Sequence, residues 1–214
     1  MQRIETVEDI GRGLDVLVAC DARLAAVRRL AGDVPLRRRP PGLQTLASII
    51  VAQQVSRASA EAIFGRLCKL AVPFTAQQLL ELGEEGMVQA GLSRAKQRAL
   101  TALSMAIVDG KLELAELCDV PAEQAIADLV AVPGIGPWTA QVYLLTAAGH
   151  PDIFPAGDVA LQTAARHALA LDVRPNAKVL AHLAESWRPW RSVAARLLWA
   201  YYREMKGAEA APGA

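Results

Sequence analysis

A glycine turn set between two helical patterns constrains this chain more than any other feature of its sequence. The turn has the sequence PGIGP at residues 133–137, within the stretch LVAVPGIGPWTAQVYLLTAAGHPDIFPAGDVALQTAARHAL that covers residues 129–169. Glycine adopts positive φ at little cost and lets another group approach the backbone closely. The pattern therefore predicts a tight reversal from one helix into the next. Taken alone, a Gly-x-Gly turn is more often a plain chain reversal than a binding site.

Helical periodicity extends over nearly the whole chain. Apolar residues from Leu43 to Ile50 follow the i, i+3, i+4 spacing of a helix, and no alternating run of β-branched residues is long enough to predict a strand. Further helices are predicted over residues 94–108 (after an N-cap at Ser93), 121–130 (with Pro121 in the first turn), 159–169, 176–185 and 189–204. The sequence predicts an all-α fold of about ten short helices over residues 1–206, followed by a disordered tail at 207–214.

Composition narrows the function classes. With 214 residues and 53% apolar composition, the chain is large enough for one domain or two closely packed ones. The 23 basic and 22 acidic residues nearly cancel, which argues against coating nucleic acid through long-range charge alone. The charge balance does not exclude local binding of DNA through backbone amides or a small basic patch. Each basic cluster on its own is more simply a solvated surface.

The cysteines and the chain start indicate a reducing compartment. Cys20, Cys68 and Cys118 are far apart and form no C-x-x-C pair, so neither a zinc site nor a disulfide framework is expected. The first residues are charged and do not form a signal peptide, and no apolar run has the length of a membrane span. We expect a cytoplasmic protein, by default a monomer.

The turn and a later carboxylate together suggest a site for a phosphorylated ligand. The turn's amides and the positive end of the following helix would suit a DNA phosphate. Asp158 stands twenty residues beyond Trp138, directly before the helix predicted at 159–169. Its plain interpretation is an N-cap. The role of Asp158 as an N-cap is compatible with a catalytic role, because a helix N-terminus also favours an ionised carboxylate.

The segment LVAVPGIGPWTA resembles the helix-hairpin-helix of DNA repair glycosylases, and Asp158 matches the aspartate that completes that signature. IIVAQQVS at 49–56 and WRPWRSVAARLLWAYY at 187–202 resemble the alkylpurine branch, the DNA-3-methyladenine glycosylase II (AlkA) type. The resemblance covers roughly residues 30–205. Larger members carry an N-terminal β-rich domain, for which this sequence starts too late, so a compact form is expected. The resemblance implies a middle helical subdomain at about 43–150, a second one made from both chain ends, and a cleft between them.

The resemblance also implies an activity. We expect a monofunctional glycosylase that removes alkylated purines such as 3-methyladenine from duplex DNA in base excision repair, leaving an abasic site. Asp158 would stabilise the positive charge that develops on the deoxyribose and help to activate water. A lone carboxylate suits a purine that is already cationic and needs little acid assistance to leave. Trp138 stands where lyase-active members carry a lysine, so no Schiff base is expected.

Other site residues follow from the same resemblance. Trp199, Trp138 and Val142 would line the base pocket, although core packing is a plain alternative for both tryptophans. Gln54 would fill the gap left by the flipped nucleotide, although a polar helix end explains it about as well. The expected DNA contacts are Gln54, Gly134, Ile135, Gly136, Thr139 and Arg191. The backbone carbonyls of Val130, Val132 and Ile135 would hold a monovalent cation.

No iron–sulfur cluster is expected, because the cluster-bearing branch needs four cysteines near its C-terminus and this chain has none after Cys118. Two other functions stay open. One is a glycosylase for a neutral base such as hypoxanthine or uracil, which would need an acid or a polar pocket that Val142 and the tryptophans do not supply. The other is a noncatalytic binder of distorted or abasic DNA, which would not need Asp158.

Overall fold

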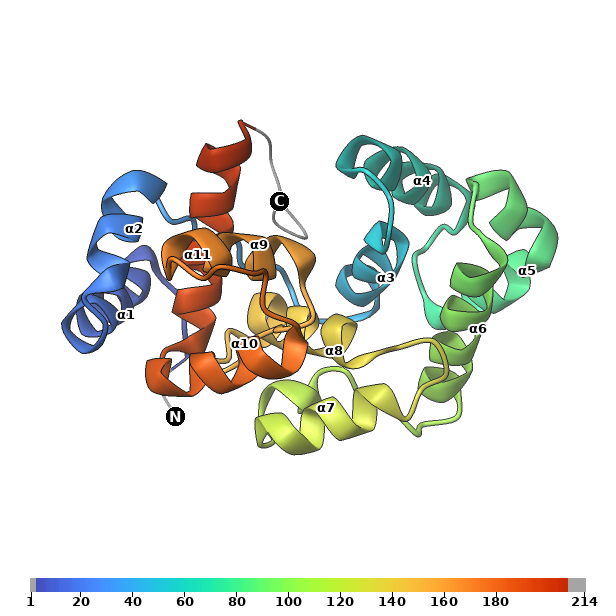
Figure 1. Ribbon diagram of the computed structural model, residues 1–214. Helices are drawn as coiled ribbons and strands as arrows, with labels where there is room; N and C mark the ends of the chain where they lie inside the picture. Colours follow the sequence, from blue (N-terminus) through green and yellow to red (C-terminus); the bar gives the residue numbers. More distant parts are fainter. Residues whose placement is uncertain (1–2, 208–214) are drawn as a thin grey trace. The chain divides into compact units, whose positions relative to one another are not determined.

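The computed structural model describes residues 3–207, which divide into two compact units. The middle unit comprises residues 39–148, and the second unit combines the chain up to Arg38 with the chain from Gly149 onward. Eleven α-helices, two 3₁₀ turns and one π turn make up the regular structure, and residues 3–207 contain no strand (Figure 1). The predicted all-α fold is confirmed. The predicted tail, apart from Gly207, lies outside the described residues, and the expected cleft stays a prediction.

Six α-helices form most of the middle unit. They are α3 (Leu43–Ala52), α4 (Arg57–Leu70), α5 (Ala76–Ala90), α6 (Arg94–Val108), α7 (Ala122–Val130) and α8 (Pro137–Tyr143), with a 3₁₀ turn η1 (Glu116–Cys118) and a π turn η2 (Leu144–Ala148). Helix α3 packs against α4, α6 and α8, and its residues Leu46 and Ile50 are fully buried. The N–H of Gly42, just before α3, donates to the buried hydroxyl of Tyr143 at 2.9 Å. Helix α3 is therefore anchored to α8 at its N-terminal end.

The second unit is built around one long buried helix. Its elements are α1 (Val7–Cys20), α2 (Arg23–Ala31), α9 (Val159–Ala168), α10 (Ala177–Ala184), η3 (Glu185–Trp187) and α11 (Arg191–Lys206). Helix α11 packs against α1, α2 and α9, and every residue from Ser192 to Ala200 is buried. A helix buried on all sides lies at the centre of its unit. Helix α11 is therefore the support on which the neighbouring loops of this unit are fixed.

The predicted helix limits hold to within two residues. Helix α6 has the expected bounds, but the Ser93 side chain makes no capping hydrogen bond. Pro121 is the N-cap residue of α7 and does not lie in its first turn. Helix α11 begins two residues after the expected Pro189, because Trp187 to Trp190 form a turn closed by a backbone hydrogen bond of 2.8 Å. Among the described helices, none is long and apolar enough to cross a membrane.

Candidate functional site

The hairpin between α7 and α8 needs glycine at position 134 for two reasons. Gly134 has φ of +91°, and a Cβ atom placed on it would lie 2.5 Å from the Cβ of Ala99 on α6. The N–H of Ile135 donates to the carbonyl of Val132 at 3.1 Å and closes the turn. Positive φ and close approach both exclude a larger side chain. The apex of the hairpin therefore rests directly on α6.

The fold does not require glycine at position 136. Its backbone is extended, with φ of −89° and ψ of 170°, and an added Cβ atom would meet nothing within 4 Å. Across residues 3–207, no backbone carbonyl accepts a hydrogen bond from the N–H of Gly134 or Gly136. Pro137 then starts α8, where its missing N–H costs nothing. The backbone at Gly136 is open to close approach by an external group.

The turn between α3 and α4 presents an exposed glutamine in an unusual conformation. Gln54 has φ of +56° and an exposed side chain. Ser56 then caps α4 by accepting a hydrogen bond from the Ser59 N–H. Non-glycine residues with positive φ are uncommon and mark positions that the surrounding structure imposes. The Gln54 turn, defined as residues 53–55, is thus a fixed and accessible feature of the middle unit.

Asp158 is the N-cap of α9 in the second unit. Its Oδ1 atom accepts hydrogen bonds from the N–H of Leu161 at 2.9 Å and from the indole N–H of Trp199 on α11 at 3.3 Å. Its exposed fraction is 7%. The capping interpretation is confirmed, and the indole adds a second donor. Both donors and the helix N-terminus stabilise negative charge on this carboxylate.

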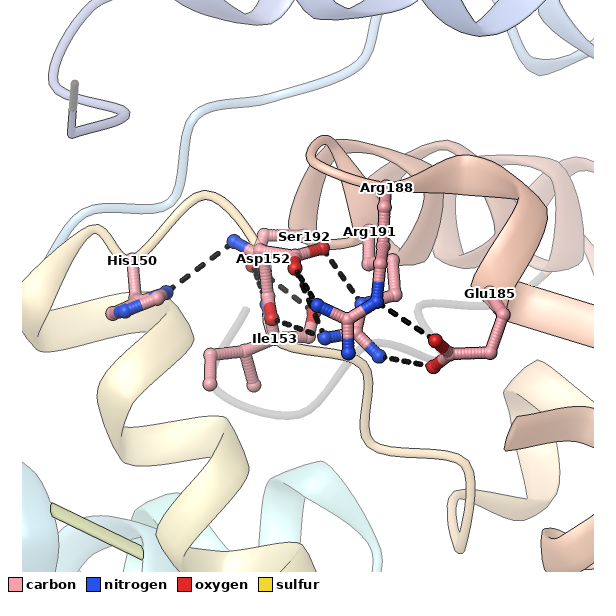
Figure 2. Close-up of polar contacts among 7 residues, drawn as sticks. All are labelled: His150, Asp152, Ile153, Glu185, Arg188, Arg191 and Ser192. Atoms are coloured by element: carbon pink, nitrogen blue, oxygen red, sulfur yellow. Dashed lines mark hydrogen bonds and ion pairs between the residues drawn. The ribbon is translucent and has the colours of Figure 1, made fainter. Parts of the chain in front are cut away.

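The loop that leads to Asp158 is fastened to the start of α11 (Figure 2). Arg191 donates from Nε and Nη2 to the two carboxylate oxygens of Asp152, at 2.6 and 3.0 Å, and from Nη1 to Glu185 at 2.6 Å. Arg188 donates to Asp152 as well, at 2.8 Å. The Ser192 hydroxyl exchanges hydrogen bonds of 3.0 Å with the N–H and carbonyl of Ile153. Helix α11 therefore holds this loop through its first residues and Asp158 itself through Trp199.

Comparison with known proteins agrees with this arrangement of motifs. Residues 47–189 match the family model described as the HhH-GPD superfamily base excision DNA repair protein. The chain belongs to this superfamily. A crystal structure of DNA-3-methyladenine glycosidase from Bacillus halodurans superposes with a TM-score of 0.79 at 31% identity, covering 91% of each chain. The 3-methyladenine DNA glycosylase Mag1 of Schizosaccharomyces pombe, in complex with abasic DNA, has the same TM-score at 23% identity, covering 90% of this chain and 95% of that one, and supports the fold alone.

Among curated relatives, a probable bifunctional transcriptional activator/DNA repair enzyme AlkA of Mycobacterium tuberculosis is 32% identical over 186 residues. The match covers 81% of this chain but 36% of that protein, so the chain spans about a third of the relative's length. The predicted family resemblance is confirmed by the family model and by these relatives.

Two predicted site residues of this HhH-GPD protein lie in the core of the middle unit. Thr139 has an exposed fraction of 1%, and its hydroxyl accepts a hydrogen bond from the Gln53 amide at 2.7 Å. The hydroxyl of Thr139 is therefore used inside the middle unit, and the role of Thr139 as a DNA contact stays a prediction. Val142 is fully buried as well, and its role as a pocket residue stays a prediction. Trp138 is half-buried on the first turn of α8, and its pocket role stays a prediction.

Two further predicted site residues lie in the second unit. Trp199 has an exposed fraction of 3%, and its indole N–H donates to Asp158, while its role in stacking on a base stays a prediction. The Arg191 side chain has an exposed fraction of 16%, and its guanidinium binds Asp152 and Glu185. Its donors therefore already serve the loop, and its contact with DNA stays a prediction.

The hairpin predictions are refined at the level of single atoms. The Ile135 N–H donates inside the turn, whereas the N–H groups of Gly134 and Gly136 donate to no backbone carbonyl within residues 3–207, and a phosphate contact at these three residues stays a prediction. The Val132 carbonyl accepts that hydrogen bond and keeps a second lone pair. Sequence reasoning missed Gln53 and Asp152 as supporting residues. Neither lies in a motif that indicates its partner.

Proposed function

We propose that this protein is a monofunctional DNA glycosylase that hydrolyses the N-glycosidic bond of alkylated purines in duplex DNA and leaves an abasic site. The observation that carries the proposal is the carboxylate of Asp158, held at a helix N-terminus by Leu161 and Trp199 in a chain of this repair superfamily. The name of the Bacillus halodurans relative, a DNA-3-methyladenine glycosidase, supports alkylated purines as the substrate class.

The chemistry follows from the charge on Asp158. Cleavage of an N-glycosidic bond passes through a transition state in which the sugar resembles an oxocarbenium ion. A fixed carboxylate stabilises that positive charge without having to reorganise. Purines alkylated at N3 or N7 carry a positive charge and leave as neutral bases, so they need little help from an acid. This match between a single carboxylate and a cationic leaving group favours alkylated purines over neutral bases.

DNA would be held mainly by the middle unit. The N–H groups of Gly134 and Gly136 would donate to a backbone phosphate, which gives affinity without sequence preference. Gln54 is exposed on its turn and would enter the space left by the extruded nucleotide. The carbonyl of Val130 lies at the negative end of α7, and those of Val132 and Ile135 follow it. Together they would hold a monovalent cation that offsets the phosphate charge.

The absence of a lyase step is part of the proposal. Position 138 carries tryptophan, which has no amine to form a Schiff base with the sugar. Purified protein would be incubated with methylating-agent-treated duplex DNA, and free bases would be resolved by chromatography. We expect methylpurines to be released, with strand breaks only after alkali and no borohydride-trapped complex. Binding of abasic duplex without any base release would contradict the proposal and indicate a noncatalytic binder.

A further inference from the structure

The Gln54 turn is held on one side by a buried lysine. The last carbonyls of a helix have no partner within the helix. At the end of α3, the carbonyl of Val51 accepts a hydrogen bond from Lys96 Nζ on α6 at 2.7 Å. Lys96 has an exposed fraction of 8%, and this burial lowers the pKa of its ammonium group. Burying a charged group is costly unless it is hydrogen-bonded, so this contact is a specific feature of the fold.

The same turn is held on its other side by α8. The side-chain amide of Gln53 donates to the hydroxyl of Thr139 at 2.7 Å. Thr139 lies in the first turn of α8, the helix that the hairpin introduces. A hydrogen bond across 86 residues of sequence thus joins the residue before Gln54 to the helix that follows Gly136.

Helix α6 supports both the Gln54 turn and the hairpin. Lys96 and Ala99 are three residues apart and therefore lie on the same face of α6. Lys96 anchors the end of α3, and Ala99 contacts the hairpin at Gly134. The Gln54 turn and the hairpin thus rest on adjacent turns of one helix, and α8 links them a second time. All of these contacts lie inside the middle unit.

We propose that Lys96, Gln53 and Thr139 form a brace that positions the Gln54 turn relative to the hairpin, so that the middle unit presents both to DNA as one rigid surface. The inference rests on the proposed function for the identity of the ligand. The three side chains act as positioning residues, since Thr139 and Lys96 are buried and Gln53 is turned towards Thr139. The brace also explains why Gln54 holds a positive φ, a conformation that neighbouring structure must impose.

The brace predicts that substitutions in it and in the Gln54 turn do not change DNA affinity independently of one another. Duplexes with a tetrahydrofuran abasic-site analogue, and matched undamaged duplexes, would be titrated with the 214-residue chain and its variants. We expect Gln53→Ala, Thr139→Val and Gln54→Ala each to weaken binding of the abasic duplex about fivefold, as the loss of one hydrogen bond would. The Gln53→Ala/Gln54→Ala double variant should bind about as well as either single variant, because contacting residues are not additive. Thr139→Ser, which keeps the hydroxyl, should restore the parent affinity.

A second readout does not depend on DNA. In the free protein, hydrogen exchange over residues 51–56 should be about tenfold faster in Thr139→Val than in the parent or in Thr139→Ser. Gln77→Ala is the matched control, because it removes an exposed glutamine that pairs with Glu81 on α5 of the same unit. The control should change neither exchange nor affinity.

The outcomes separate the brace from the proposed function. Additive losses in the double variant, or unchanged exchange in Thr139→Val, would overturn the brace even if the protein binds and repairs DNA. A parent that binds neither duplex and releases no base would overturn the proposed function. In that case accelerated exchange in Thr139→Val would still establish that these contacts hold the turn rigid.

Discussion

The indole N–H of Trp199 donates to Oδ1 of Asp158 across 41 residues of sequence, at 3.3 Å. The same oxygen accepts the N–H of Leu161 and caps α9. Two elements of the second unit therefore fix one carboxylate, and one of the two donors is the indole of Trp199, which the sequence predicts to stack on a base. Preorganisation of this kind is what electrostatic stabilisation of a transition state requires.

Trp199→Phe should lower base release while leaving the fold intact. The change removes the indole donor, and we expect the single-turnover rate to fall about tenfold, the effect of one hydrogen bond to a charged group. Trp187→Phe is the matched control, because the buried Trp187 indole donates to Asp21 at 3.2 Å in the same unit. That control should lower the melting temperature without changing the rate per folded molecule. Equal rates in the two variants would contradict a positioning role for Trp199.

The two hairpin glycines should respond differently to alanine. Gly134→Ala should destabilise the protein by more than about 1 kcal/mol, because alanine fits neither the positive φ nor the contact with Ala99. Gly136→Ala should leave the free energy of unfolding unchanged, since the added methyl group meets open space. It should nevertheless weaken binding of duplex DNA, because it blocks close approach to the amides. Denaturant titration and DNA titration of both variants test this, and full DNA affinity in Gly136→Ala would exclude a phosphate at that position.

Arg191→Ala should act through the loop and not through DNA charge. Loss of the paired hydrogen bonds to the buried Asp152 should destabilise the protein by about 2 kcal/mol. A phosphate-contacting arginine would also reduce the slope of log affinity against log salt concentration by about 0.9. We expect that slope to be the same in Arg191→Ala and the parent, measured by DNA titration over a series of salt concentrations. A reduced slope would contradict this expectation and support Arg191 as a DNA contact.

His150 should make the second unit less stable in mild acid. Burial lowers the pKa of His150 below its ordinary value of 6.5, and its Nδ1 accepts the Asp152 N–H at 3.3 Å, which a protonated ring could not do. The unfolded chain therefore binds a proton at higher pH than the folded chain does. Stability is complete above the ordinary pKa and falls as the pH drops towards the lowered folded pKa. Melting temperatures of the parent and His150→Asn across this range should show a shallower decline in the variant. Parallel curves would exclude His150 as the cause.

Local features were predictable from the sequence, and long-range partners were not. Apolar periodicity located the helices, and aspartate before an apolar run predicted the cap of α9, because both depend on neighbouring residues. Asp152, which Arg191 binds, and Asp158, which Trp199 binds, stand 39 and 41 residues away, and no spacing rule indicates which buried group such a side chain will meet. Gln53 was missed for the same reason, since only the packing of α3 on α8 brings it to Thr139.

The most direct test is the single-turnover release of 3-methyladenine from methylated duplex DNA by the parent and by Asp158→Asn. Asparagine keeps an oxygen that can cap α9 but removes the negative charge. Asp172→Asn, at an exposed aspartate of the same unit, controls for the general loss of one carboxylate. With matched melting temperatures, we expect Asp158→Asn to be at least about 100-fold slower and Asp172→Asn to match the parent. Parent-level release by a folded Asp158→Asn variant would contradict the central claim that this carboxylate drives base excision.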